Sequence, residues 1–208
     1  MMLVSRSQAS AAWCRTGRTR YAPAAVARLP YPDPSGSPEP VREALAALPP
    51  LNIFRMLSHA ETAFRPFLRF GGAILGRLEL DPKLRELAII QVARDAEAEY
   101  EWVQHVAISR KVGVPDEQIA AVEAGRLDDP ALGDSERAVL QFAREVVAGP
   151  RVSDATFAAV EKQLSPQEIV ELLLTVGNYL MLARVMTTLE LELDDPAGGR
   201  VLSTRLPR

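Results

Sequence analysis

Three ionisable side chains, Glu86, Glu101 and His105, occupy segments whose pattern predicts burial. Glu86 lies in the segment RELAIIQVA at 85–93, and the other two lie in EYEWVQH at 99–105. Burying a charged group costs free energy, so such groups are rare unless they are paired or used in chemistry. A carboxyl group and an imidazole are the residue types of general acid–base catalysis, in which protons pass to and from a substrate.

Helical spacing places Glu101 and His105 together. At about 100° per residue they lie one turn apart on the same side of a helix. Ile108 and Val112 fall on that side too, so the acid and the imidazole share an apolar face.

The preceding segment repeats this pattern. Glu86 shares its sector of the helix with the apolar residues Ile89, Ile90 and Ala93, whereas Arg85, Gln91 and Asp95 lie outside it. A hairpin of the two helices would bring all three ionisable groups to one pocket.

Two interpretations of the histidine compete. In the first, His105 is a general acid/base, or an electrophile beside a developing oxyanion, and Glu101 orients the ring and stabilises its protonated form. In the second, the two residues are a buried pair that holds helices together. An isolated pair favours the second interpretation.

Four further residues are candidates for binding a substrate. Arg85 could bind a carboxylate, although its helical phase, about 100° from Glu86, favours a surface position. His59 could line the pocket, although a loop or cap role is favoured. Tyr100 and Trp102 flank the Glu101 face, where they serve as packing or as a pocket wall.

The elements that must position these residues are helices, and the predicted fold class is all-α. Asp81-Pro82 reads as an N-cap with proline at the first helical position, and Ser165 to Glu168 reads as a capping box. Helices are predicted at 41–47, 52–58, 62–75, 82–95, 97–112, 115–124, 134–147, 153–163 and 169–189.

The 169–189 stretch is the most apolar in the chain. Glu171, Asn178 and Arg184 interrupt it, which argues against a membrane span and favours a core or subunit-interface helix. An interhelical or intersubunit hydrogen-bond network explains the stripe of Glu171, Thr175 and Asn178.

Composition narrows the class of protein. The chain has 208 residues and a net charge of −3, so no global field favours nucleic acid or an anionic membrane. Its single cysteine, Cys14, cannot form an intrachain disulfide, and no Cys/His cluster resembles a metal site, so we predict a cytoplasmic protein without a bound metal. Dithiol peroxidase chemistry needs an attacking thiolate and a resolving thiol, and neither is present in the predicted pocket.

Domain boundaries follow from composition. Residues 1–30, rich in Ser, Ala and Arg, are predicted to be a disordered extension or an over-long start, in preference to a transit-like peptide. Residues 31–195 form the helical domain, and 196–208 form a tail.

The spacing Glu86-x11-Ala98-x2-Glu101-x3-His105 resembles the signature of the carboxymuconolactone decarboxylase family, whose superfamily includes the alkylhydroperoxidase-D-like proteins. The peroxidase branch has cysteines where this chain has Ala98 and Glu101, and the decarboxylase branch has glutamate at the second position, as here. Weaker similarity extends from about 28 to 193. With Glu86 at the family spacing, the catalytic interpretation of His105 becomes the favoured one.

The resemblance implies a lyase or isomerase that needs no cofactor. In the family's manner, an unsaturated lactone loses a carboxylate from its γ-carbon and forms a dienolate. A protonated His105 would stabilise the oxygen, and Glu101 or Glu86 would deliver the proton. The resemblance also implies a homo-oligomer, a trimer or a hexamer built from trimers.

The chain is longer than the compact decarboxylases, so its small-molecule substrate is open: another unsaturated lactone, a β-keto acid or a specialised metabolite. The alternatives are a peroxidase-like or redox-associated role, disfavoured by the missing cysteines, and a non-enzymatic helical scaffold. Peroxide reduction with a thiol donor tests the first, and turnover of γ-carboxylated lactones tests the second.

Overall fold

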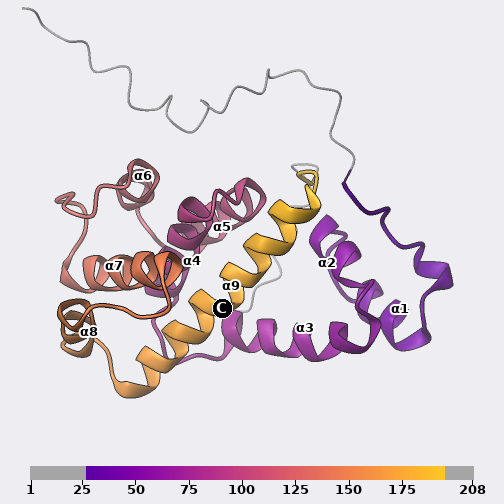
Figure 1. Cartoon of the computed structure of the whole chain (residues 1–208), viewed down its shortest axis with the longest axis horizontal. Helices are drawn as coiled ribbons and strands as arrows, with labels where there is room; N and C mark the ends of the chain where they lie inside the picture. Colours follow the sequence, from indigo (N-terminus) through magenta and orange to yellow (C-terminus); the bar gives the residue numbers. More distant parts are fainter. Residues whose placement is uncertain (1–26, 195–208) are drawn as a thin grey trace, which may run out of the picture.

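The computed structural model describes residues 27–194, and within them the fold is all-α, as predicted (Figure 1). A short 3-10 turn, η2 (Pro34–Gly36), precedes the helices. The helices are α1 (Glu39–Ala46), α2 (Asn52–Leu57), α3 (Glu61–Gly76), α4 (Pro82–Asp95), α5 (Glu99–Val112), α6 (Asp116–Ala124), α7 (Asp134–Ala148), α8 (Asp154–Glu161) and α9 (Pro166–Leu189).

The ends of several helices follow the predicted capping chemistry. The Asp81 carboxylate accepts hydrogen bonds from the backbone N–H groups of Lys83 and Leu84 at the start of α4. Ser165 and Glu168 form the reciprocal capping box that begins α9. Gly113, with a φ of 92°, ends α5 in the left-handed conformation that glycine adopts without strain.

The start of α5 differs from the prediction by two residues. Glu97, predicted to be helical, has a φ of 53° and lies in the turn between α4 and α5. A left-handed residue cannot continue a right-handed helix, so α5 begins at Glu99.

Helix α4 is the centre of the body of the molecule and packs against α5, α6, α7 and α9. Every residue from 85 to 93 is buried, including Arg85 and Gln91. The surface position favoured for Arg85 is therefore wrong, and Gln91, which lies outside the sector of Glu86, is buried as well. The prediction assumed an amphipathic helix with one solvent face, but a helix surrounded by four others has none over this stretch.

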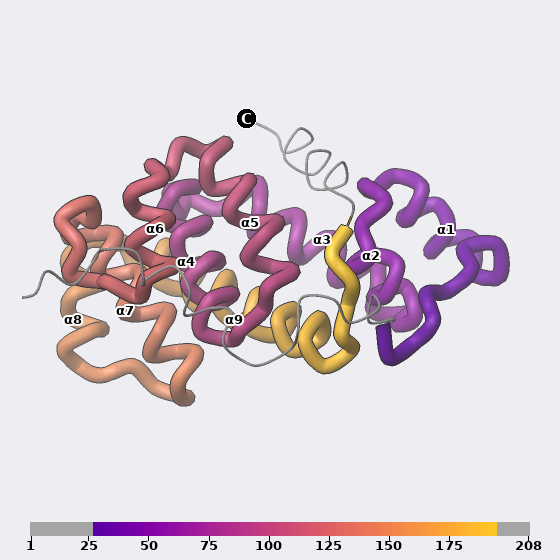
Figure 2. The backbone as a smooth tube through the Cα atoms, turned by 90° about the horizontal axis from the view of Figure 1, so that it is seen from above, coloured from indigo at the N-terminus to yellow at the C-terminus, as the bar shows by residue number. Residues whose placement is uncertain are grey.

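The first three helices lie at the opposite end of the molecule from α6, α7 and α8 (Figure 2). Helix α9 crosses between these two ends and packs on α4 and α7 in the body and on α3 (Figure 1). Its 24 residues are long and apolar enough to span a membrane by composition, and 44% of its most apolar window is buried in the protein. The role of a core helix fits this packing.

The folded part begins earlier than predicted. The backbone N–H of Ala27 donates to Glu192 Oε1 (3.1 Å), and that of Arg28 donates to the Leu189 carbonyl (2.9 Å). Ala27 and Arg28 are thus bound at the end of α9, within the segment 1–30 that was predicted to be an extension. The predictions for residues 1–26 and 196–208 concern parts of the chain outside the described residues.

Candidate active site

A cavity of about 390 Å³ lies between the first three helices and the α5–α9 pair. Its polar wall comes from Tyr100, Glu101, Gln104 and His105 on α5 and from Asn178 and Tyr179 on α9. The opposite wall is apolar and is formed by side chains between residues 47 and 57 and by α3. A cavity of this size, mostly apolar with a few convergent polar groups, has the usual character of a small-molecule site.

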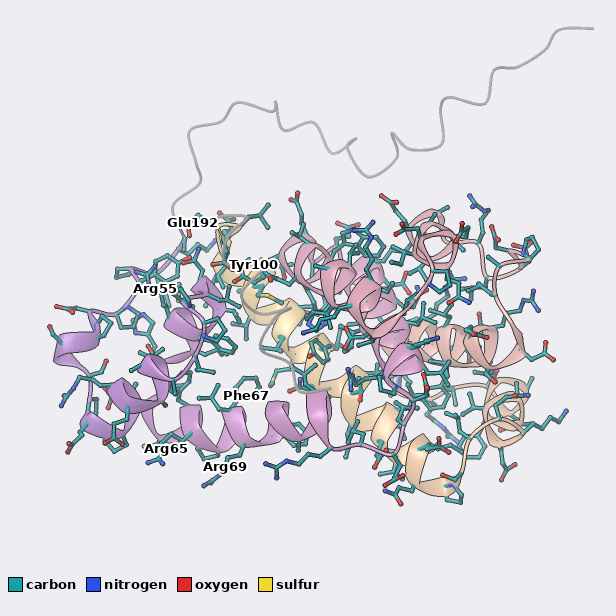
Figure 3. The ribbon with its side chains drawn as sticks, turned by 180° about the vertical axis from the view of Figure 1, so that it is seen from behind. Arg55, Arg65, Phe67, Arg69, Tyr100 and Glu192 are labelled. Carbon is teal, nitrogen blue, oxygen red and sulfur yellow. The ribbon has the colours of Figure 1, made fainter. Side chains whose placement is uncertain are left out.

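Helix α3 contributes Phe67, which points toward the cavity side, whereas Arg65 and Arg69 project from the other side of the helix (Figure 3). Gly71 and Gly72 line the cavity within an unbroken α3. Residues without side chains at this wall leave room for a ligand.

His105 is held by Glu86 across the α4–α5 interface. The imidazole Nδ1 lies 2.8 Å from Glu86 Oε2, and Glu86 is fully buried behind the ring. An ionised carboxylate can only accept, so Nδ1 carries the proton, and in the neutral ring Nε2 is the acceptor. His105 lines the cavity, and its ring is oriented there by a buried carboxylate.

Arg85 completes this group. Its Nε and Nη2 donate to the second oxygen of Glu86, Oε1, at 3.1 and 3.0 Å. Both oxygens of Glu86 therefore have partners, and the guanidinium compensates the buried charge. Neither Arg85 nor Glu86 lines the cavity, so Glu86 is a positioning residue and Arg85 is not placed to bind a substrate carboxylate.

The expectation that Glu101 orients the imidazole is wrong. Glu101 is 1% exposed, and neither of its carboxyl oxygens has a hydrogen-bond partner. Glu101 and His105 are one turn apart on one helix and both face the cavity, whereas Glu86 reaches the ring from the neighbouring helix. Burial, with the nearby charge of Glu86 as a second cause, raises the pKa of Glu101 well above its ordinary value. Its carboxyl group is therefore kept protonated in a range where an exposed glutamate is ionised.

Tyr179 packs edge-on against His105, with ring centroids 4.7 Å apart and an interplanar angle of 82°. Burial, together with the charges of Glu86 and Glu101, raises the pKa of its phenol well above the usual value. The ring fixes one side of the imidazole, and its hydroxyl stays neutral.

The predicted hydrogen-bond stripe on α9 is only partly present. Glu171 Oε2 accepts from the Leu80 backbone N–H (2.8 Å), and the Thr175 hydroxyl donates to the Glu171 carbonyl (2.8 Å). Asn178 does not continue the stripe, because its Oδ1 is buried without a partner and the residue lines the cavity.

Two polar residues of the cavity wall are held by Asp194, which the sequence prediction missed. This carboxylate accepts hydrogen bonds from the Tyr100 hydroxyl, the Asn52 backbone N–H (2.7 Å) and Gln104 Nε2 (3.2 Å). Tyr100 lies beside the C-terminal end of α9 (Figure 3). Gln104 could have been identified from the sequence as a pocket residue, because it lies three positions after Glu101 on the same helix face.

Two predicted candidates lie away from the cavity. His59 is exposed, and its Nε2 lies 2.8 Å from the Pro30 carbonyl oxygen, which agrees with the favoured loop role. Trp102 packs against the apolar cluster that contains Leu87 and Ile90. Within residues 27–194, no three His, Cys, Asp or Glu side chains gather as a metal site would require.

Comparisons with known proteins agree with this architecture. Residues 61–145, which carry Glu86, Glu101 and His105, match the carboxymuconolactone decarboxylase family. An alkylhydroperoxidase AhpD core structure, a peroxidase-related protein from Ralstonia eutropha, aligns with a TM-score of 0.72 at 22% identity over 88% of this chain and 98% of its own. No curated protein sequence matches.

Two further structures share the fold. An AhpD-type protein of unknown function from Agrobacterium tumefaciens has a TM-score of 0.61 at 18% identity, over 67% of this chain and 95% of its own. The debrominase Bmp8, a cysteine-to-alanine variant in complex with 2,3,4-tribromopyrrole, has a TM-score of 0.64 at 18% identity, over 88% and 97%. Residues 61–145 of this chain are thus similar to the carboxymuconolactone decarboxylase family, and the fold is of the alkylhydroperoxidase-D-like type.

Proposed function

We propose that the cavity is the active site of a lyase or isomerase that works by proton transfer at an unsaturated carbonyl compound and needs no cofactor. The observation that carries the proposal is the pairing of two unlike groups on one cavity wall. His105 is a base with its free nitrogen available, and Glu101 is a carboxylic acid held in its neutral form. Titratable neighbours whose environments differ in this way are the usual mark of acid–base assignments.

An isomerisation uses both groups. His105 Nε2 removes a proton from the carbon next to the carbonyl, and the electrons move into an extended enolate. The neutral Glu101 carboxyl donates a hydrogen bond to the developing enolate oxygen. The protonated His105 then returns the proton to the far carbon of the conjugated system, which shifts the double bond and restores the resting enzyme.

A decarboxylation would use the same residues in part. Breaking the bond to the carboxyl carbon releases carbon dioxide and leaves the electron pair in the enolate, which Glu101 stabilises. A proton donor must then protonate carbon, and either a protonated His105 or the neutral Glu101 carboxyl would supply that proton. The hydrogen bond from Nδ1 to Glu86 forms with either charge of the ring, and in the neutral ring Nε2 is the acceptor that an isomerisation uses.

The structural relatives include a peroxidase-related protein, which raises a redox role as a second candidate. The residues that line this cavity include no cysteine, and the single cysteine of the chain is Cys14. The acid–base proposal is therefore preferred to thiol chemistry. Peroxide reduction with a thiol donor remains the direct test of the alternative.

The test of the proposal is isotope exchange. The neutral β,γ-unsaturated butenolide α-angelica lactone is incubated with enzyme in deuterated water and followed by NMR, beside a γ-carboxylated butenolide assayed for carbon dioxide. We expect deuterium incorporation and movement of the double bond above the enzyme-free rate. His105→Ala should lower the rate about 10²–10⁴-fold, the usual contribution of a general base.

A scaffold would behave differently. Equal rates in wild type and His105→Ala, with both proteins folded by thermal unfolding, would end the proposal in favour of a non-enzymatic role. Glu145→Gln on α7, far from the cavity lining, is the matched control and should leave turnover unchanged.

We also propose a homo-oligomer, in keeping with the expectation from the family. Four apolar side chains on α9, Val170, Leu173, Leu174 and Met181, are 42–56% exposed in the single chain. Contiguous exposed apolar side chains are typical of interfaces. Size-exclusion chromatography with light scattering tests this proposal, and a monomer would contradict it.

A further inference from the structure

Several polar atoms of the cavity wall have no hydrogen-bond partner, and those of Gln104 and Asn178 are carbonyl acceptors. Within the described residues, six buried side-chain oxygens lack a hydrogen bond, and four of them belong to Glu101, Gln104 and Asn178, which line the cavity. A buried acceptor left unpaired costs free energy, and a ligand that donates to it removes that cost. The wall is therefore suited to a ligand with N–H or O–H groups.

The orientation of the Gln104 amide supports this assignment. Gln104 is 7% exposed, and its Nε2 donates to Asp194 Oδ2 at 3.2 Å. Rotating the amide would place its oxygen against the carboxylate of Asp194, so Oε1 is the atom left over as an acceptor. Asp194 is itself held by Tyr100 and by the backbone of Asn52, so the chain of bonds keeps Gln104 in place.

The described lining of the cavity has no permanently charged cation to neutralise an anion, and His105, its one basic side chain, is already paired with Glu86. Among the described residues that line it there is no lysine or arginine. The guanidinium of Arg85 lies behind the site and is engaged by Glu86 Oε1. A carboxylate would lose its water among acceptor oxygens and apolar side chains, which is a costly transfer without a paired cation.

We infer that the substrate is an uncharged, largely apolar small molecule carrying a hydroxyl or ring N–H, which Gln104 and Asn178 recognise through their carbonyl oxygens. It is not a carboxylate. The inference rests on the proposed function only in calling this ligand the substrate. It narrows that function to isomerisation, because a decarboxylase must accept a carboxylated compound.

The test uses three probes of similar size: phenol is neutral and a donor, anisole is neutral without a donor, and benzoate is an anion. Binding to the full chain is titrated at pH 7 by ligand-observed NMR. We expect phenol to bind about three- to tenfold tighter than anisole, the value of the one net hydrogen bond that its hydroxyl can donate. Benzoate should bind at least about tenfold more weakly than phenol, because its charge is not compensated.

Single substitutions test whether Gln104 and Asn178 cause the preference for phenol over anisole. Gln104→Leu and Asn178→Leu should each bring phenol closer to anisole. Gln91→Leu is a matched control, because Gln91 is also buried, donates from Nε2 to an aspartate (Asp95, 2.6 Å) and has an unpaired Oε1, but does not line the cavity. It should leave the ratio unchanged, and its thermal unfolding shows what losing such an amide costs in stability alone.

The inference is overturned if benzoate binds as tightly as phenol, or if both cavity variants keep the wild-type ratio of phenol to anisole. Its failure and that of the proposed function are separable. Retained phenol preference without any deuterium exchange removes only the proposed function. Faster turnover of the carboxylated butenolide than of its neutral counterpart removes only the inference about charge.

Discussion

The surroundings of Glu101 on α5 and of Glu145 on α7 shift the pKa values of these two carboxyl groups in opposite directions. Glu145 accepts hydrogen bonds from the Thr156 hydroxyl (2.6 Å), the Ser153 backbone N–H (2.6 Å) and Gln141 Nε2 (2.8 Å). Led by the bond from Thr156, these donors lower the pKa of Glu145 to about 2. Glu101 has no donor on either oxygen, and burial moves its pKa the other way.

The difference separates a structural carboxylate from a chemical one. Glu145 uses its whole acceptor capacity to join the end of α7 to the start of α8, so it has nothing left for a ligand. Glu101 lies on the wall of a cavity, and neither of its carboxyl oxygens has a hydrogen-bond partner. Unmet polar groups lower stability, and proteins retain them where function needs them.

Glu86 is the case between the two, because it is as buried as Glu101 and as fully partnered as Glu145. Glu86→Gln removes the charge that compensates Arg85 in the interior. We expect a loss of about 3–5 kcal/mol in the free energy of unfolding, the usual cost of breaking a buried ion pair. Urea denaturation measures it.

A loss below about 1 kcal/mol, the value typical of an exposed ion pair, would contradict the buried triad. Arg85→Met together with Glu86→Gln is the control, because removing both charges should restore much of the stability.

Replacement by leucine should change the stability of the protein in opposite directions at Glu101 and at Glu145. Glu101→Leu should raise the free energy of unfolding by about 1–3 kcal/mol, because it removes unmet buried polar atoms, while exchange activity falls about 10²–10³-fold with the lost oxyanion donor. Glu145→Leu should lower the thermal midpoint and leave activity intact.

Thermal unfolding and the exchange assay, run on both proteins, provide this comparison. If Glu101→Leu is less stable than wild type and keeps its activity, Glu101 is a structural residue and the contrast with Glu145 disappears.

The smallest expected effect is in the pH dependence of stability. A raised folded-state pKa means that folded Glu101 binds its proton more tightly than the unfolded chain does. The favourable contribution of Glu101 to the free energy of unfolding is therefore complete below about pH 4.5, the ordinary pKa of a glutamate. It is lost as the pH rises through the elevated pKa of the folded state. For Glu145 the contribution is present above about 4.5 and is lost as the pH falls toward about 2.

Unfolding midpoints of wild type, Glu101→Gln and Glu145→Gln across this pH range measure both slopes. Glu101→Gln should flatten the decline above pH 4.5, and Glu145→Gln should flatten the decline on the acid side. Identical profiles for wild type and Glu101→Gln would show that the Glu101 carboxyl is not perturbed.

Much of the helical framework was predictable. Asp81-Pro82, the Ser165 to Glu168 box and Gly113 are local signals, and the structure has helix ends at each of them. The predicted start of α5 was two residues too early, because nothing in the sequence around Glu97 indicates a left-handed backbone conformation. The partial failure of the stripe on α9 has another cause, since Asn178 faces a cavity that exists only when α3 packs beside it.

The sequence by itself determined the helices, the apolar faces and the presence of Glu86, Glu101 and His105 on them, because these depend on caps and on a 3.6-residue period that act over one or two turns. Only the tertiary structure decided that Glu86 holds the imidazole, that Arg85 is buried against Glu86, and that Glu101, Gln104 and Asn178 keep free acceptors on a cavity wall. Those outcomes depend on which helix packs against which. Packing, and the loss of water that comes with it, joins residues that are far apart in the chain and changes the chemistry of each.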